Sequence, residues 1–417
     1  MQRRPGIQPL LRTSMQRVVI TGMGALSGLG LDVPSLAAAL RAGTSGIERM
    51  QSVDVEQLRF SQGAEVRGFV PENHFEAREL GFMERFAQLA VVAARQAVRE
   101  AGVEWTAELR EETAVVTGSC LGGRGAEETG YWELFHNNRT RVHPLTIPLS
   151  MTNAATSHIS MQFGLQGPAY TVSTACSSSA HAIGQAFHMV RSGTVPMALA
   201  GGAENTFFIG GLKAWEAMRV VSKDTCRPFS LERTGLILGE GAAMLVLEPL
   251  ETALARGAKP LAEIVGFGMS ADAGHITQPL LSGPARAMRL ALRDARLQPE
   301  QIGYINAHGT ATDANDRTEC AAIREVFGAH AEQLAISSTK SMHGHALGAA
   351  GAIEAVASVL ALREGFLPPT ANFLSPDPAC DLDVIPNESR EVAVEACLSN
   401  SFAFGGLNAV LAFRAMP

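Results

Sequence analysis

Short apolar runs alternate along the chain with longer segments in which apolar residues recur at helical spacing. The segment after Cys176 is one example, because Ala180, Ile183 and Phe187 recur every three or four residues and would share one helix face. In the first half we predict strands over 18–22, 113–118, 169–174, 197–201 and 242–247, and helices over 35–42, 87–101, 177–192 and 250–256. This alternation predicts an α/β fold with largely parallel strands.

A similar order of elements returns in the second half. There we predict strands over 262–268, 303–307, 334–338, 395–400 and 409–414, and helices over 283–295, 321–326 and 348–363. The helix over 348–363 is almost wholly apolar, which indicates a helix buried on all sides at the centre of the protein. We therefore predict two similar halves, 17–261 and 262–417, although no sequence repeat is visible between them.

The composition indicates a large globular protein and argues against some classes of function. A chain of 417 residues with 46% hydrophobic content can bury a large core. A net charge of -7 argues against a nucleic-acid binder. The best candidate for a membrane span, over 349–362, is too short and is interrupted by Glu354.

The cysteines and the N-terminal segment bear on cellular location. Six cysteines without a CxxC pair or regular spacing argue against a zinc ribbon and a disulfide scaffold. They predict reduced thiols in a cytoplasmic protein. The segment 1–16 is basic but has no apolar core and no small-residue cleavage site. We expect a disordered extension or a misassigned start codon there.

The first candidate for chemistry is Cys176, which lies where a predicted strand passes directly into a predicted helix. A helix N-terminus carries positive partial charge, so we expect it to favour the thiolate and to lower the pKa of Cys176. On such a strand-to-helix turn the backbone amide of Cys176 could also face an oxyanion formed when the sulfur attacks a carbonyl. The local pattern therefore favours a nucleophile.

Two histidines in later loops complete a candidate site. His308 follows a predicted strand in a loop rich in Gly and Thr, and His345 directly precedes the buried helix. One cysteine and two histidines placed in this way support nucleophilic acyl chemistry. A Cys/His/His zinc site is the alternative, but the sequence indicates no fourth ligand for the metal.

These residues stand in motifs that together resemble one family. The motifs TACSSS, NAHGTAT, SSTKS and GHALGAAGAIE, with VVITGMG, CRPFSLERTGLILGEGAA and NSFAFGGLN, resemble the β-ketoacyl-ACP synthases of the synthase II type. The resemblance extends from about residue 17 to the end of the chain. Within the family, the stretches LKAWEAMRVVSKDTCRPFS and PPTANFLSPDPACDLDVIPN are most similar to nodulation protein E and to polyene-forming ketosynthases.

The resemblance implies a thiolase-like fold, with two βαβαβαββ halves in a five-layered αβαβα arrangement. It implies decarboxylative Claisen condensation of malonyl-ACP with a cysteine-bound acyl chain, in fatty acid, polyene or polyketide biosynthesis. No cofactor is expected, because the substrates arrive on the phosphopantetheine of an acyl carrier protein. The expected assembly is a homodimer, or a heterodimer with a subunit like a chain-length factor.

The resemblance also implies a role for each site residue. Cys176 would carry the acyl group, with an oxyanion hole formed by its amide and that of Phe402. His308 and His345 would stabilise an enolate, and Lys340 would support them while paired with Glu354. The remaining residues would gate the acyl channel (Phe402, with Phe404 beside it), hold the pantetheine arm (Thr310, Thr312) and line the acyl tunnel (Leu121).

The chain also departs from the family pattern. Ala403 and Leu407 replace a usual glycine and threonine in the closing motif, and Asp313 and Asn315 replace a usual proline and glycine near His308. A Cβ at 403 would remove the free access to positive φ that glycine has. These departures favour a specialised pathway over a housekeeping role.

Two other functions remain open from the sequence. A non-catalytic partner subunit would lack the active cysteine, whereas a catalytic subunit that requires such a partner fits the motifs. A cysteine hydrolase that releases acyl groups to water would need one general base, which would leave the second histidine and Lys340 unexplained. Arg139, Arg141, Lys213, Arg219 and Lys223 could form a basic rim for an acidic carrier protein.

Overall fold

The computed structural model describes residues 15–416, and two sets of elements in it follow the same order. The first set comprises β1 (Val18–Ser27), α3 (Arg85–Ala101), β4 (Ala114–Gly118), α7 (Ala154–Phe163), β5 (Ala169–Val172), α8 (Ser178–Arg191), β6 (Ala198–Glu204) and β7 (Gly241–Pro249). The second comprises β8 (Ala262–Ala271), α11 (Ser282–Ala295), β9 (Tyr304–Asn306), α12 (Asp313–Phe327), β10 (Ala335–Ser337), α14 (Ala350–Glu364), β13 (Ala396–Ala403) and β14 (Leu407–Ala415). Each set reads βαβαβαββ, as expected.

The sheet topology also repeats between the halves. The strand order is β5-β4-β6-β7-β1 in the first half and β10-β9-β13-β14-β8 in the second, and pairing of β1 with β8 joins them. The strands β4, β5 and β6 run parallel, as do β9, β10 and β13. The prediction of largely parallel strands is wrong for β1, β7, β8 and β14, which pair antiparallel. Antiparallel neighbours need only a short turn, and only three residues separate β13 from β14.

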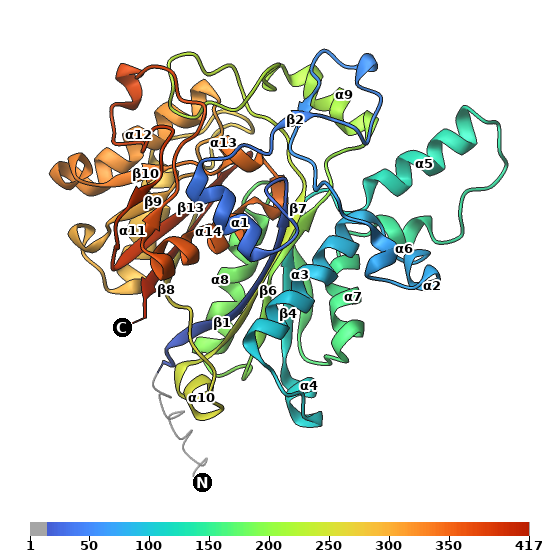
Figure 1. The fold of residues 1–417 in the computed structure, drawn as a ribbon, viewed down its shortest axis with the longest axis horizontal. Helices are drawn as coiled ribbons and strands as arrows, with labels where there is room; N and C mark the ends of the chain where they lie inside the picture. Colours follow the sequence, from blue (N-terminus) through green and yellow to red (C-terminus); the bar gives the residue numbers. More distant parts are fainter. Residues whose placement is uncertain (1–14, 417) are drawn as a thin grey trace, which may run out of the picture.

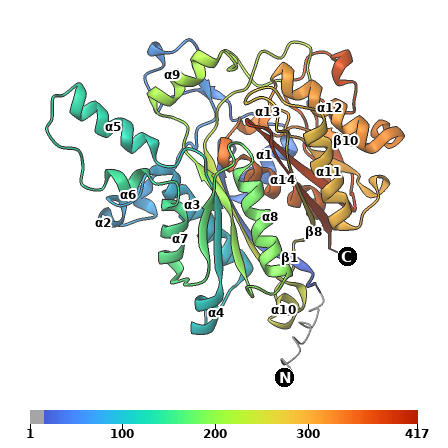
Figure 2. The same cartoon turned by 180° about the vertical axis from the view of Figure 1, so that it is seen from behind.

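The helices form three layers around these two half-sheets (Figures 1 and 2). α3 and α7 cover the outer face of the first half, and α11 and α12 cover the outer face of the second. α8 and α14 pack against each other and contact strands of both halves. The result is the expected αβαβα arrangement, with α8 and α14 as the central layer.

The central helix α14 has the burial that its sequence predicts. Its residues from Ala350 to Leu362 are all buried. Close contact with α8 depends on Gly351, because a Cβ at this position would lie 2.9 Å from the Cβ of Ala180 and 3.0 Å from its backbone nitrogen. The helices that follow the Cys176 turn and the His345 loop are therefore in direct contact.

Two structural features were not predicted from the sequence. The helices α5 (Arg124–Phe135) and α6 (Thr146–Ser150) form an arm that projects from the body (Figure 1). Its apolar side chains include Trp132, Phe135 and Ile147, which are exposed in the single chain. α12 begins eight residues earlier than predicted, because its first two turns are polar and lack the apolar spacing.

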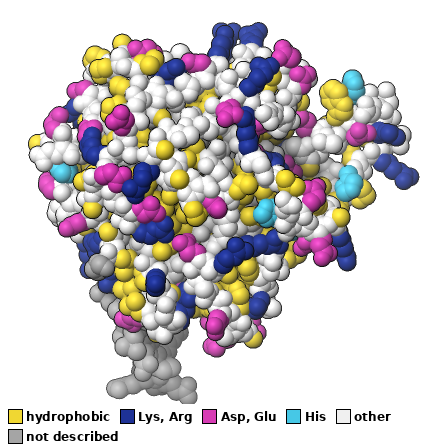
Figure 3. All heavy atoms as spheres, in the orientation of Figure 1, with side chains coloured by type: hydrophobic (Ala, Val, Ile, Leu, Met, Phe, Trp, Pro, Cys, Tyr) yellow, Lys and Arg dark blue, Asp and Glu magenta, His cyan; other side chains and the backbone are white. Residues whose placement is uncertain are grey.

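The structure also bears on surface charge, on a membrane span and on the N-terminal segment. Basic and acidic side chains are interspersed over the face in Figure 3. Within the described part of the chain, no helix is long and apolar enough to cross a membrane. The expected disordered or misassigned segment 1–16 lies, apart from its last two residues, outside the described residues. The division into 17–261 and 262–417 stays a prediction.

Candidate active site

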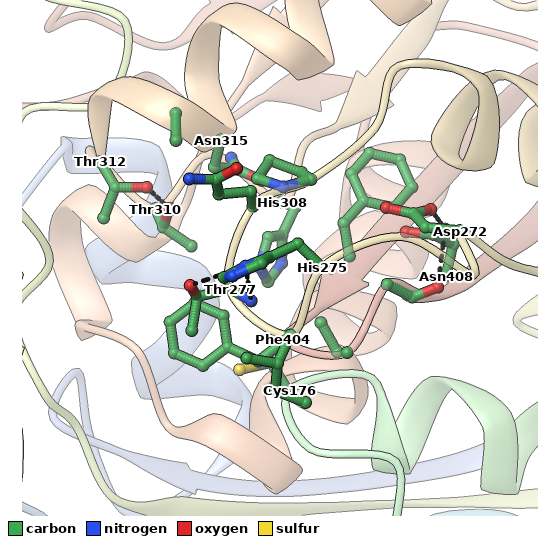
Figure 4. Close-up of a pocket in the computed structure, with 18 of the residues that line it drawn as sticks. Cys176, Asp272, His275, Thr277, His308, Thr310, Thr312, Asn315, Phe404 and Asn408 are labelled. Carbon is green, nitrogen blue, oxygen red and sulfur yellow. Dashed lines mark hydrogen bonds between the residues drawn. The ribbon is translucent and has the colours of Figure 1, made fainter.

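One cavity brings together most of the predicted site residues (Figure 4). Its walls come from the loop after β5, the loop after β9, the segment between β8 and α11, and the turn between β13 and β14. Seven predicted residues line it: Cys176, His308, Thr310, Thr312, His345, Phe402 and Phe404. Residues from both halves of the chain therefore build a single site.

The turn at Cys176 has the predicted strand-to-helix form. Ala175 adopts a positive φ of 50°, and the amide of Ser177 donates to the carbonyl oxygen of Thr174 at 3.3 Å. However, the expected lowering of the Cys176 pKa is wrong. Burial raises the pKa of this thiol to about 11, although the charge of Lys340 and nearby backbone amides partly oppose the rise. The effect of burial on the Cys176 pKa therefore exceeds the opposite effect of the helix N-terminus.

A different amide from the expected one accompanies that of Cys176. The backbone N–H groups of Phe404 and Cys176 both lower the pKa of the Cys176 thiol. Phe402 instead lies inside β13, opposite Asn408, with its ring centroid 6.1 Å from that of His308. We expected Phe402 to supply the second amide of an oxyanion hole, whereas the amide that acts on the Cys176 thiol beside its own is that of Phe404.

The turn after Phe402 is tied to the Cys176 turn and to a neighbouring loop. Ser177 Oγ donates to the carbonyl oxygen of Leu407 at 2.9 Å, and the amide of Gly405 donates to that of Ile276 at 2.7 Å. The positive φ angles fall at Gly405 and Gly406, at 83° and 67°, and not at Ala403. The expected restriction at Ala403 is therefore absent in this conformation.

Lys340 fixes the protonation of His308. The ammonium Nζ lies 3.3 Å from His308 Nδ1 and donates to the His308 carbonyl oxygen at 2.7 Å. An ammonium can only donate, so Nδ1 must accept and the ring proton must sit on Nε2. Burial, together with the positive charge of Lys340, holds the pKa of His308 well below its usual value. His308 is therefore a neutral imidazole whose Nε2–H is available to the cavity.

His345 completes the histidine pair. Its ring lies edge-on to that of His308, with centroids 5.4 Å apart. Burial and the charge of Lys340 also lower its pKa well below the ordinary value. By contrast, His343 is held inside the protein, with Nε2 2.9 Å from Thr339 Oγ1 and Nδ1 2.8 Å from the Gly344 carbonyl oxygen. His343 therefore belongs to the loop structure and does not line the cavity.

The predicted partner of Lys340 is present. Lys340 Nζ forms a salt bridge with Glu354 Oε1 from α14, and both side chains are fully buried. Burial raises the pKa of Glu354 to about 7, although the Lys340 charge opposes the rise. The ion pair keeps the ammonium beside His308 at the end of the central helix.

Three further predicted residues differ in their relation to the cavity. Thr310 and Thr312 line it, and their hydroxyl oxygens lie 2.8 Å apart. Leu121 lies outside this cavity, in an apolar cluster that also contains Cys176. Its amide donates to Glu204 Oε1 at 3.1 Å.

Buried carboxylates hold the site loops, and we did not identify them from the sequence. Glu319 accepts the amides of His308 and Gly309 at 2.9 and 2.8 Å, and Asp316 accepts that of Ala311 at 3.2 Å. Burial raises the pKa of both carboxyl groups, that of Asp316 to about 7. The sequence signal that could have identified them is the pair of acidic residues that follow His308 by eight and eleven positions.

Glu204 has the same role on the other side of the site. It is fully buried at the end of β6 and accepts the Cys120 and Gly348 amides at 2.8 and 3.1 Å. It therefore joins the loop after β4 to the start of the α14 region. Among residues 15–416, no group of three or more His, Cys, Asp or Glu side chains is arranged to hold a metal ion.

The five-layered fold and the Cys–His–His site define a condensing enzyme of the thiolase-like class. Residues 15–253 match the β-ketoacyl synthase N-terminal domain, and residues 261–374 match the β-ketoacyl synthase C-terminal domain. The chain belongs to the β-ketoacyl synthase family. It is an acyltransferase of the ketosynthase type.

Individual relatives are similar to this chain over nearly its whole length. Nodulation protein E of Rhizobium sp. (strain N33) is 49% identical over 96% of this chain and 99% of its own length. The 3-oxoacyl-[acyl-carrier-protein] synthase 2 of Staphylococcus aureus (strain COL) is 40% identical over 96% and 98%. The solved structure of the ishigamide ketosynthase/chain length factor superposes with a TM-score of 0.93, at 38% identity over 97% of this chain and 100% of that one.

Proposed function

We propose that this enzyme extends acyl chains by decarboxylative condensation, with Cys176 as nucleophile and His308 and His345 as the enolate-stabilising pair. One observation carries the proposal: the three side chains line one cavity. The lowered pKa of both histidines favours neutral imidazoles there. The cavity also holds two threonine hydroxyls suited to a substrate arm. No step of this reaction requires a cofactor.

The first step loads the enzyme. The Cys176 sulfur attacks the thioester carbonyl of an acyl group on a carrier protein, and a new thioester forms. The oxyanion that develops lies near the amides of Cys176 and Phe404, which stabilise it. The pantetheine sulfur leaves and takes up the proton that the Cys176 thiol gives up.

The second step produces the carbon nucleophile. Malonyl thioester binds, its carboxylate leaves as carbon dioxide, and the electron pair of the broken bond forms an enolate at the thioester oxygen. The Nε2–H groups of His308 and His345 donate to this oxygen where the charge develops. Lys340 keeps the His308 proton on Nε2, so that a donor faces the oxygen throughout.

The third step joins the two chains. The enolate carbon attacks the acyl carbonyl on Cys176, a carbon–carbon bond forms, and the Cys176 sulfur leaves as a thiolate that takes up a proton from water. The product is a 3-oxoacyl thioester on the carrier, longer by two carbons. Cys176 then returns to the free thiol and can be loaded again.

The substrates fit delivery by an acyl carrier protein. One relative is named as a synthase of 3-oxoacyl-[acyl-carrier-protein]. Lys213 and Arg219 lie on or directly after α9 (Ile209–Met218), the helix whose Trp215 lines the cavity. Basic residues beside this helix would attract an acidic carrier. The six free thiols are consistent with a reducing cytoplasm.

The assembly we propose is a dimer. β5 is the outer strand of the first half-sheet, and Ala169 and Tyr170 on it are exposed. An open strand edge with exposed side chains is suited to pairing with a second chain. A homodimer and a heterodimer with a chain-length-factor-like subunit both fit, and the ishigamide structure combines a ketosynthase with a chain length factor.

The acyl chains we propose are specialised, and unsaturated or polyene chains are the first candidates. Identity is higher to nodulation protein E, at 49%, than to the staphylococcal synthase 2, at 40%. Ala403 and Leu407 alter the turn that adjoins Cys176. These two features favour a pathway outside housekeeping fatty acid synthesis.

The test is mass spectrometry of the purified protein after incubation with a panel of acyl-carrier-protein thioesters, followed by malonyl-ACP. We expect an acyl adduct on Cys176 that converts to a 3-oxoacyl-ACP product. The Cys176→Ala variant should form neither species. Free fatty acid as the main wild-type product would support the hydrolase instead. Product only after addition of a second subunit would assign the heterodimer.

A further inference from the structure

Asn315 is a polar residue of the cavity to which the steps above give no role. It lies in the first turn of α12 and lines the cavity beside His308 and Thr312 (Figure 4). The family pattern described above has glycine at this position. The carboxamide is therefore an additional hydrogen-bonding group that this chain brings to the site.

The two ends of the Asn315 carboxamide can be told apart from their neighbours. Its Nδ2 lies 3.1 Å from Asp316 Oδ1 and 3.4 Å from Glu319 Oε2. The Ala311 amide already donates to Asp316 Oδ1 and the Gly309 amide to Glu319 Oε2, so both oxygens act as acceptors and require a donor from Asn315. The NH₂ group must therefore face the carboxylates, and Oδ1 must point away from them.

Oδ1 is consequently an acceptor without a hydrogen-bond partner among residues 15–416. It belongs to a side chain that lines the cavity close to the hydroxyls of Thr310 and Thr312. Because these hydroxyls are hydrogen-bonded to each other, one of them keeps its O–H for a ligand, and this wall presents one hydroxyl donor and one fixed carbonyl acceptor. A secondary amide, with one C=O and one N–H, matches both kinds of group at once.

We propose that Asn315 is a positioning residue for the substrate arm, and that its Oδ1 accepts an amide N–H of the phosphopantetheine. The proposal rests on the proposed function, because it assumes a pantetheine-borne substrate. The alternatives on the substrate fit less well. An unsubstituted acyl chain has no N–H, and the malonyl carboxylate would be repelled by a carbonyl oxygen.

Asn315 also connects the arm to the catalytic loop. The carboxylate of Glu319 accepts from both Asn315 and the amide of His308. Loss of the side chain would remove one donor from Glu319 and could alter kcat for purely structural reasons. A test must therefore separate recognition of the amide from support of the loop.

The experiment combines a protein variant with a substrate variant. The full-length enzyme and Asn315→Ala are assayed with malonyl-pantetheine and with two analogues, in each of which one amide N–H is replaced by an ester oxygen. For the wild type, one analogue should raise KM about twofold to tenfold, the value of one hydrogen bond. Asn315→Ala should raise KM for the normal substrate by a similar factor, and that analogue should cause no further loss.

The controls keep each failure distinguishable. Asn73→Ala, at an exposed asparagine in the short helix η2 (Pro71–Asn73), should leave KM unchanged. Asn315→Gly provides the same comparison with the residue usual in the family if Asn315→Ala does not fold. The proposal would be overturned if the analogue raised KM for Asn315→Ala by as much as it does for the wild type. It would also be overturned if Asn315→Ala left KM for the normal substrate unchanged. Absence of any acyl adduct on Cys176 in the wild type would instead overturn the proposed function.

Discussion

Lys340 Nζ lies 3.3 Å from His308 Nδ1, and this contact sets the chemistry of the site. Because the ammonium offers only donors, it holds the histidine proton on Nε2, which is free to face the cavity. The positive charge also disfavours protonation of both imidazoles and lowers their pKa. One buried cation thus keeps both imidazoles neutral and sets the position of the proton on His308.

The first prediction concerns these two donors. His308→Ala or His345→Ala should slow carbon dioxide release from malonyl-ACP by about a hundredfold or more, since each removes one hydrogen bond to the developing charge. Loading of Cys176 should change much less, because the sulfur and its two amides remain. Radiolabelled carbon dioxide and the mass of the acyl-enzyme report the two steps separately. The exposed His136→Ala serves as control, and equal loss in both steps would contradict the assignment.

The second prediction follows from the pKa of Cys176, which burial raises to about 11. At pH 7 the thiolate fraction of such a thiol is on the order of 10⁻⁴. The rate of alkylation by iodoacetamide should therefore rise about tenfold per pH unit from pH 7 to pH 10. Alkylation of Cys176→Ala gives the background from the other thiols. A plateau near pH 8.5 would show that the pKa is not raised.

The third prediction concerns the buried ion pair of Lys340 and Glu354. Lys340→Ala should destabilise the protein by about 3–5 kcal/mol, because it leaves a buried carboxyl group without its partner. Urea unfolding followed by circular dichroism measures this loss. The Glu354→Gln variant, which keeps the shape but removes the negative charge, should be destabilised as well.

The loss in Lys340→Ala should also depend on pH. The folded pKa of Glu354, about 7, exceeds the unfolded value of about 4.3, so the folded state holds the proton more tightly. The stability contribution is fully present below pH 4.3 and declines as the pH rises through 7. Without Lys340 the pKa of Glu354 in the folded state should rise further. The stability should then continue to decline up to a higher pH. The variant should therefore be closest to wild type at pH 5, and equal losses at pH 5 and pH 8 would refute the interpretation.

The fourth prediction concerns the turn after Phe402. Ala403 lies in β13 opposite Leu407 without positive φ, so Ala403→Gly relieves no strain and only adds chain freedom. The added freedom should cost about 0.5–1 kcal/mol of stability. Because this turn adjoins Cys176, the added freedom should also change the distribution of product chain lengths. Ala415→Gly, at the far end of β14, is the matched control. Identical product profiles for wild type and Ala403→Gly would exclude a role of this position in selectivity.

Much of the architecture could be predicted because it depends on local patterns. Apolar periodicity located α8, and the wholly apolar segment 348–363 indicated the buried central helix. The motifs indicated which side chains carry the chemistry, and the structure brings seven of them to one cavity. The sequence could not show the mixed strand directions, because pairing joins residues far apart in the chain.

The sequence by itself determined which residue types are available and in which order the elements occur, since both follow from local composition and spacing. Only the tertiary structure decided the state of each group. At Cys176 the effect of burial exceeds that of the helix N-terminus and raises the pKa. Removal from water destabilises the thiolate by more than the partial charges of the helix stabilise it. The structure likewise brought the Phe404 amide to Cys176 and gave Glu319, Asp316 and Glu204 their partners, since such contacts join distant segments.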